Sequence, residues 1–188
     1  MRYFTADTHF SHANIIKYCN RPFESAGLMD AVLIQNWNEV VKPEDVVYHL
    51  GDVALGSSDR VKHILSVLNG SKVLIIGNHD RSANRMKEWG FSEVHQSLQL
   101  ELEGGILANL SHYPYKGTPD PFNNQRKFET KNLKDDGRLL LCGHVHTAWK
   151  SRPGQYKNFM VNVGVDQWNF KPVSEAQVIE FIKGLTNN

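Results

Sequence analysis

Cysteine is scarce in this sequence of 188 residues. Only Cys19 and Cys142 occur, far apart and outside any metal-type or redox-type pair. A secreted disulfide framework, or a structural zinc site built on thiolates, needs more cysteine than this. We therefore expect a reducing compartment and a cytoplasmic location.

Long apolar runs are missing as well. A run such as 73–76 (Val-Leu-Ile-Ile) has the length of a strand and falls far short of the roughly 20 residues that cross a bilayer. Residues 1–7 contain no basic head followed by an apolar stretch, which is the pattern of a signal peptide. We expect no membrane partner.

Neither sign of charge is in excess. Lys and Arg total 21 against 20 for Asp and Glu, so the net charge is +1 and strong nucleic-acid binding is not expected. Any affinity for phosphate must be local. Hydrophobic residues make up 40% and charged residues 22%, as in globular proteins, and the length suits one domain over 1–188. The sequence does not indicate an oligomeric state.

Strand-like runs alternate with helical patterns along the chain. We expect strands at 2–6, 46–50, 72–76, 106–111, 138–142 and 159–163, with further strands within 92–103, and helices near 26–41, 59–68, 81–89 and 174–184. In the first helix, Leu28, Leu33 and Trp37 belong to the stripe expected to face the core. The alternation predicts an α/β fold.

The stretch 113–128 breaks this alternation, because it is rich in Pro, Gly and Asn and has no apolar period. Between positions 115 and 134 there are five basic residues and two acidic ones, interspersed with aromatic residues. Connections this long are usually functional or disordered. We predict a flap at 113–128, with a plain solvated loop as the alternative.

Side chains that bind metals recur where the expected strands end. The groups are Asp7-Thr8-His9, Gly51-Asp52, Gly77-Asn78-His79-Asp80, Ser111-His112 and Gly143-His144-Val145-His146. Loops at the carboxyl ends of strands in an α/β sheet converge on one crevice, so these groups are expected to meet. The glycines leave room for sharp turns beside the site.

The candidate metal ligands are Asp7, His9, Asp52, Asn78, His112, His144 and His146. Oxygen and imidazole ligands suit manganese, iron, nickel or zinc, and we favour manganese. The set is too large for one ion and suits two divalent ions if a carboxylate bridges them, for which we choose Asp52. Two ions roughly 3.5 to 4 Å apart can generate hydroxide at neutral pH while holding phosphoryl oxygens.

The five groups, in this order, resemble the blocks of the calcineurin-like metallophosphoesterases: Asp-x-His, Gly-Asp, Gly-Asn-His-Asp/Glu, a separate His and Gly-His-x-His. The resemblance runs from Asp7 to His146. It implies a four-layer α/β/β/α sandwich with a dinuclear centre at the strand ends. It also implies that Asp7, His9, Asp52 and His146 hold the first ion, that Asp52, Asn78, His112 and His144 hold the second, and that His79 protonates the leaving oxygen.

The sequence departs from the family pattern after the second block. Many members have Asp-Arg three and four residues beyond its Asp, where this chain has Leu55-Gly56. Whether Asp59 or Arg60 replaces that pair is left open by the sequence.

The opening Asp-x-His-Phe-x-His, residues 7–12, resembles a small bacterial and phage-type subgroup. Its His12 either holds a phosphate oxygen of the substrate, as Asn78 is also expected to do, or caps the following helix. His49 lies within a strand and is expected to be a core or supporting histidine rather than a ligand.

The function that these residues predict is a dinuclear metal-dependent phosphoesterase. It would hydrolyse phosphodiester or phosphomonoester bonds of a small phosphorylated substrate, such as a nucleotide, by attack of metal-bound hydroxide, with His79 and Asp52 as catalytic residues. Two alternatives are a nuclease acting on DNA or RNA ends and a non-catalytic metal-binding interaction module.

Overall fold

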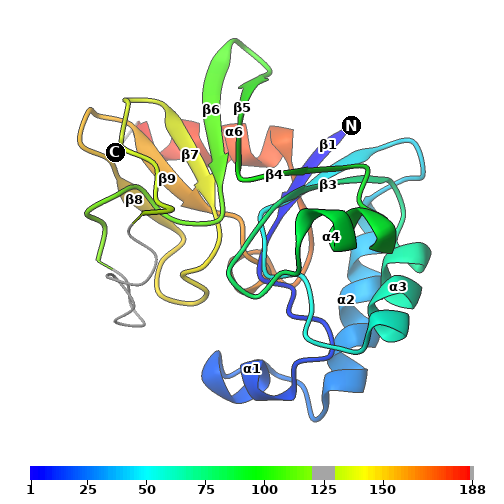
Figure 1. Ribbon diagram of the computed structural model, residues 1–188. Coiled ribbons are helices and arrows are strands. Elements are labelled where there is room, and N and C mark those ends of the chain that lie inside the picture. Colours follow the sequence, from blue (N-terminus) through cyan, green and yellow to red (C-terminus); the bar gives the residue numbers. More distant parts are fainter. Residues whose placement is uncertain (120–129, 187–188) are drawn as a thin grey trace.

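A computed structural model describes residues 1–119 and 130–186 (Figure 1). It contains two five-stranded sheets. The first has the order β10-β1-β2-β3-β4 and is formed by β1 (Arg2–Thr5), β2 (Val46–His49), β3 (Ser71–Ile75), β4 (Glu93–His95) and β10 (Val173–Ser174). Strands β1 to β4 are parallel, and β10 pairs antiparallel with β1 at the edge.

The second sheet has the order β5-β6-β7-β9-β8 and is formed by β5 (Ser97–Leu102), β6 (Ile106–Ser111), β7 (Leu139–Cys142), β8 (Ser151–Pro153) and β9 (Phe159–Asn162). Strands β6, β7 and β9 are parallel, whereas β5 and β8 are antiparallel to their neighbours. Each sheet therefore has a central set of parallel strands whose carboxyl ends lie on one edge.

The helices are α1 (Ala13–Tyr18), α2 (Ala26–Val40), α3 (Ser58–Val67), α4 (Ala83–Trp89), the 3₁₀ helix η1 (Val165–Gln167) and α6 (Glu175–Thr186). Serines begin two of them: Oγ of Ser25 accepts from the N–H of Leu28 at 3.2 Å, and Oγ of Ser57 accepts from that of Arg60 at 3.4 Å. Within the described ranges, none of these helices is long and apolar enough to span a bilayer.

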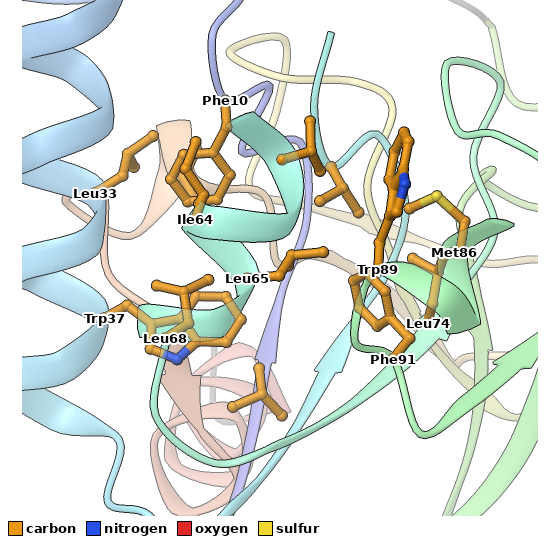
Figure 2. Close-up of a cluster of buried hydrophobic side chains, with 14 of the residues drawn as sticks. Phe10, Leu33, Trp37, Ile64, Leu65, Leu68, Leu74, Met86, Trp89 and Phe91 are labelled. Atoms are coloured by element: carbon orange, nitrogen blue, oxygen red, sulfur yellow. The ribbon is translucent and has the colours of Figure 1, made fainter. Parts of the chain in front are cut away.

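Helices α2, α3 and α4 pack on one face of the first sheet, on the right of Figure 1. Figure 2 shows this core, to which α2 contributes Leu33 and Trp37, α3 contributes Ile64 and α4 contributes Trp89. The stripe predicted on α2 is wrong at Leu28, which is 51% exposed. The face repeating every four residues is Met29, Leu33 and Trp37, so Met29 enters the core instead.

A second core fills the space between the two sheets. Phe4 of β1 faces it while the adjacent Tyr3 faces the helices, because successive side chains of a strand point to opposite sides. Leu141 of β7 enters from the opposite sheet, and Val178 and Ile179 of α6 close the edge. Parallel strands covered on both faces in this way are buried, as the apolar runs predicted.

The outer face of the second sheet carries Cys142 and Met160, and they pack with Tyr115, Leu133 and Trp149. In the part of the chain that the structure describes, loops rather than a helix thus cover this face. The predicted flap starts here, with Tyr113 and Tyr115 buried, while residues 120–128 lie outside the described residues. The mixed α/β class with two sheets and flanking helices is confirmed, and the flap stays a prediction.

Candidate metal centre

The candidate ligands lie just beyond the carboxyl ends of β1, β2, β3, β6 and β7. The loops after β1 and β2 remain side by side: the N–H of Asp7 donates to the carbonyl of Gly51 at 3.0 Å, and that of His9 donates to the carbonyl of Asp52 at 3.1 Å. The parallel pairing of the two strands therefore continues into the loops. This continued pairing places the first two motif blocks next to each other.

Most candidate ligands adopt a left-handed backbone conformation. The φ angles are 55° at Asp7, 48° at His9, 58° at Asp52, 69° at His144 and 43° at His146. Each such non-glycine residue costs on the order of 1–3 kcal/mol and persists only where its surroundings hold it. Strain concentrated at these positions indicates that side-chain placement there matters more than local backbone energy.

The glycines of the motif blocks sit against ligand side chains. A Cβ on Gly77 would lie 2.3 Å from Oδ1 of Asp52, and a Cβ on Gly143 would lie 2.7 Å from Oδ2 of Asp7. Contacts this short do not occur between real atoms, so any side chain at either position would displace a carboxylate. Glycine is required here by close approach.

In two groups of candidate ligands, the ligand atoms of each group all lie within 4.8 Å of one another. One consists of Asp7, His9 and His146, and the other of Asp7, Asp52 and His112. Oδ2 of Asp52 is 3.6 Å from Nε2 of His9 and 3.5 Å from Nε2 of His112. Asp52, a member of the second group, thus also approaches His9 of the first group, and Asp7 belongs to both groups.

Asn78 and His144 surround His112. Oδ1 of Asn78 is 3.1 Å from Nε2 of His112, and the rings of His144 and His112 are 5.2 Å apart. The backbone N–H of His144 donates to both carboxylate oxygens of Asp7, at 3.1 and 2.9 Å. The structure therefore brings all seven predicted ligands into one cluster.

His79 and His12 lie at the rim of this cluster. His79 is exposed, its backbone N–H donates to Oδ1 of Asp52 at 2.9 Å, and its ring is 5.5 Å from that of His9. The ring of His12 is 5.6 Å from that of His9, and its side chain makes no capping hydrogen bond to α1. His12 therefore occupies the N-cap position of α1 without capping the helix through its side chain.

Three carboxyl groups of the site have raised pKa values. Burial raises the pKa of Asp7 to about 7, with Asp52 and Asp166 adding to the rise and His146 opposing it. Burial also raises the pKa of both Asp52 and Asp80. Carboxylates that are buried together ionise reluctantly unless a cation joins them, so the cluster favours a bound positive charge.

The pKa values of two histidines in the cluster are shifted in opposite directions. Burial lowers the pKa of His112 to about 4, so its ring is neutral, as a metal ligand must be. Burial would also lower the pKa of His146, but Asp7 and the hydrogen bond to Asp166 outweigh it and raise the pKa to about 10. A proton on His146 thus supplies positive charge that a metal ion would replace.

Two histidines show that the residues present fit a metal. Nδ1 of His112 is 2.7 Å from the carbonyl of Leu50, which leaves the Nε2 lone pair facing the oxygens of Asn78 and Asp52. Acceptors that face one another need a cation between them. Both ring nitrogens of His9 are buried and, within the described ranges, have no hydrogen-bond partner. Coordination satisfies such nitrogens, which otherwise cost about 1–3 kcal/mol each.

Asp80 is a supporting residue for which the sequence predicted no role of its own. Its carboxylate accepts from the N–H groups of Asp52 at 3.0 Å, Val53 at 2.9 Å and Gly77 at 2.7 Å. It therefore fastens the second block to the third. The sequence signal that could have identified Asp80 was its position in the third motif block.

Asp30 of α2 supports the loop after His9. It accepts from the N–H of Ser11 at 2.7 Å and from Nη2 of Arg60 at 2.9 Å. Arg60 thus acts on the loop through Asp30, while Asp59 is exposed on α3. No sequence signal marked Asp30. His49, as expected, is a buried histidine whose Nε2 is 2.9 Å from Oγ1 of Thr8.

Comparisons with known proteins place these features in context. Residues 3–180 match the profile of the calcineurin-like phosphoesterase superfamily domain. An uncharacterized protein of Methanocaldococcus jannaschii is 35% identical over 188 residues, covering 96% of this chain and 90% of that protein. The gene 66 protein of Mycobacterium phage D29 is 33% identical over 196 residues, covering 93% of each chain. A crystal structure of a protein of unknown function from Aquifex aeolicus superposes with a TM-score of 0.72 at 33% identity, covering 96% of this chain and 98% of that one.

Proposed function

Because the chain belongs to the calcineurin-like phosphoesterase superfamily, we propose that it is a dinuclear metal-dependent phosphoesterase. The observation that carries the proposal is the cluster at the strand ends. There Asp7, His9 and His146 form one group of ligand atoms, and Asp7, Asp52 and His112 form the other.

In this proposal Asp52 joins two metal sites. Its Oδ2 has nearly the same distance to Nε2 of His9 and to Nε2 of His112, which come from different groups. Asp7, His9, Asp52 and His146 are assigned to the first ion, and Asp52, Asn78, His112 and His144 to the second. The oxygen and imidazole donors suit manganese, iron, nickel or zinc, and of these manganese is the metal that we favour. When bound, a pair of divalent ions supplies Lewis acidity, activating water and neutralising phosphoryl oxygens.

The chain's own residues contribute orientation and a proton. His79 is exposed at the rim and is held by its backbone N–H on Asp52, so its ring is available to a leaving group without being a ligand. We assign it the role of holding a proton at an imidazole nitrogen and giving it to the leaving oxygen. Asp52 thereby positions both the metals and the acid.

The proposed substrate is a small phosphorylated compound, such as a nucleotide, with phosphodiester or phosphomonoester chemistry. The net charge of +1 supports a small substrate, because a protein that follows a nucleic-acid strand needs an extended basic surface. His12 and Asn78, at the edge of the cluster beside His9 and His112, are the proposed contacts to the phosphate.

The test is reconstitution of the purified protein. The chelated, dialysed protein is loaded with Mn²⁺, its metal content is measured, and turnover is assayed with bis(4-nitrophenyl) phosphate and with 4-nitrophenyl phosphate. We expect two ions per chain and hydrolysis of at least one ester. Two bound ions without hydrolysis of either ester would favour a non-catalytic metal-binding module instead.

A further inference from the structure

Residues at the end of β9 and directly after it contact His146, although they lie outside the motif blocks. Nδ2 of Asn162 and Nε2 of Gln167 each donate to the backbone carbonyl of His146 at 2.8 Å. Oδ2 of Asp166 lies 3.2 Å from Nδ1 of the His146 ring. This 162–167 segment thus fixes both the backbone and the ring of a residue whose φ of 43° is unfavourable.

A buried arginine ties this segment to the first motif block. Nε of Arg21 donates to Oδ1 of Asp166 at 2.8 Å, and Nη2 donates to Oδ2 at 2.9 Å. The same guanidinium donates to the backbone carbonyls of Asp7 at 2.7 Å and Thr8 at 3.0 Å. The side chains of Arg21 and Asp166 are 0% and 2% exposed. One fork-shaped cation therefore spans the loop of Asp7 and the carboxylate on His146.

We propose that Arg21 and Asp166 are positioning residues of the metal centre, with Asp166 orienting the His146 ring and Arg21 holding Asp166 against the Asp7 loop. This inference rests on the proposed function. Asp166 accepts the Nδ1 proton of His146, which leaves the Nε2 lone pair for the first ion. A carboxylate behind a histidine ligand fixes the tautomer and orientation of the ring and makes the ligand more basic.

Arg21 has a second effect on the charge of the site. A carboxylate behind a buried ligand adds negative charge to a region that already holds Asp7 and Asp52. Because Arg21 pairs with Asp166 through two contacts, Asp166 orients His146 without adding net charge. Cys19 also lies near His146 and Asp166, but both Asp166 oxygens are engaged by Arg21, so this trio is not a separate metal site.

The test is metal affinity of the full chain, measured without substrate. Asp166→Asn removes the charge with little change in volume. The chelated protein is titrated with Mn²⁺ by calorimetry and with Co²⁺ by visible absorption, which reports ligand geometry. We expect one of the two ions to bind about 10–100-fold more weakly, with an altered Co²⁺ spectrum.

Glu175→Gln is a matched control. Glu175 is a buried carboxylate on α6 that also contacts an arginine through two nitrogens, since Nη2 of Arg2 donates to its Oε1 at 2.6 Å and Nε lies 2.5 Å from its Oε2. Glu175→Gln removes the same charge as Asp166→Asn does, but from an ion pair that is not part of the metal centre. Its Mn²⁺ affinity and Co²⁺ spectrum should match those of the wild type.

A second variant keeps the test decisive if Asp166→Asn fails to fold. Arg21→Lys keeps the positive charge but loses the forked guanidinium that makes two contacts with Asp166. It should weaken the binding of the same ion. Wild-type affinity and spectrum in both Asp166→Asn and Arg21→Lys would overturn this inference alone; if Asp166→Asn does not fold, Arg21→Lys decides. A wild-type protein that takes up no ion would overturn the proposed function, and this inference with it.

Discussion

Oδ1 of Asp52 accepts a hydrogen bond of 2.9 Å from the backbone N–H of His79. The other oxygen, Oδ2, faces His9 and His112. One carboxylate therefore serves two purposes, since it lies between the candidate metal sites and fixes the loop that presents the candidate acid. Changes at Asp52 and at His79 should consequently differ in what they do to metal binding.

Asp52→Asn should be the most damaging single change to the ligand set. Loss of its charge weakens the attraction for both ions, so metal content and turnover should fall together. The fall should exceed the roughly 10–100-fold typical of residues outside the ligand shell. Metal analysis after dialysis and an aryl phosphodiester assay measure both. Asp59→Asn, an exposed carboxylate on α3, is the control and should behave like the wild type. Two ions and normal turnover in Asp52→Asn would disprove the bridging role.

His79→Ala should keep both ions. Acid catalysis typically supplies about 10²- to 10⁴-fold, and only for leaving groups that need a proton. Hydrolysis of alkyl or ribose esters should fall by about that factor, and nitrophenyl esters should be much less affected. The measurement is the slope of the logarithm of the hydrolysis rate against leaving-group pKa over a series of esters. An equal fall for every ester would assign His79 to phosphate binding, and loss of metal would make it a ligand.

Gly77→Ala should damage the metal centre through space alone. The new Cβ would lie 2.3 Å from Oδ1 and 2.6 Å from the backbone nitrogen of Asp52, so the carboxylate must move. We expect weaker metal binding and a loss of about 1–3 kcal/mol of stability from overpacking. Gly27→Ala, in α2 with only Oγ of Ser25 at 4.0 Å, is the control and should be neutral or stabilise by about 0.4–1 kcal/mol. Unchanged Mn²⁺ affinity in Gly77→Ala would contradict the close approach.

Asp136 should make stability depend on acid pH. Its burial raises the pKa, but hydrogen bonds from Asn109 and Arg138 outweigh that effect and lower the pKa below its ordinary value. A depressed pKa stabilises the fold above the unfolded value of about 3.9, and that contribution is lost as pH falls through the folded value. Asp136→Asn should therefore be less stable at pH 7 and lose less stability on acidification. Urea unfolding at pH 7, 5 and 3 measures this, and parallel losses in both proteins would refute it.

The sequence predicted the elements that carry periodic patterns. The apolar runs of β1, β2, β3, β6, β7 and β9 and the helices α2, α3, α4 and α6 appear near their expected positions. The short elements α1, β8, β10 and η1 were missed, because none of them carries a strand-length apolar run or a helical period in the sequence. Leu28 was assigned to the wrong face, since Leu28 and Met29 both fit an apolar spacing and tertiary packing selects Met29.

The metal cluster was predictable because its residues are polar where strands end, and the family blocks order them. The residues that support the cluster could not be predicted from the sequence. Asp30, Arg21 and Asp166 are single charged residues, and each acquires its role only through a partner far along the chain, such as the Arg21–Asp166 pair. Local spacing carries no information about such a partner.

The proposed function requires that the cluster around Asp52 holds two ions and that hydrolysis depends on them. The most direct measurement follows turnover of bis(4-nitrophenyl) phosphate while Mn²⁺ is added to the chelated protein and bound metal is counted in the same samples. We expect no turnover without metal, and a turnover rate that rises with added Mn²⁺ and saturates at two ions per chain. Hydrolysis by the metal-free protein, or saturation without any bound metal, would contradict it.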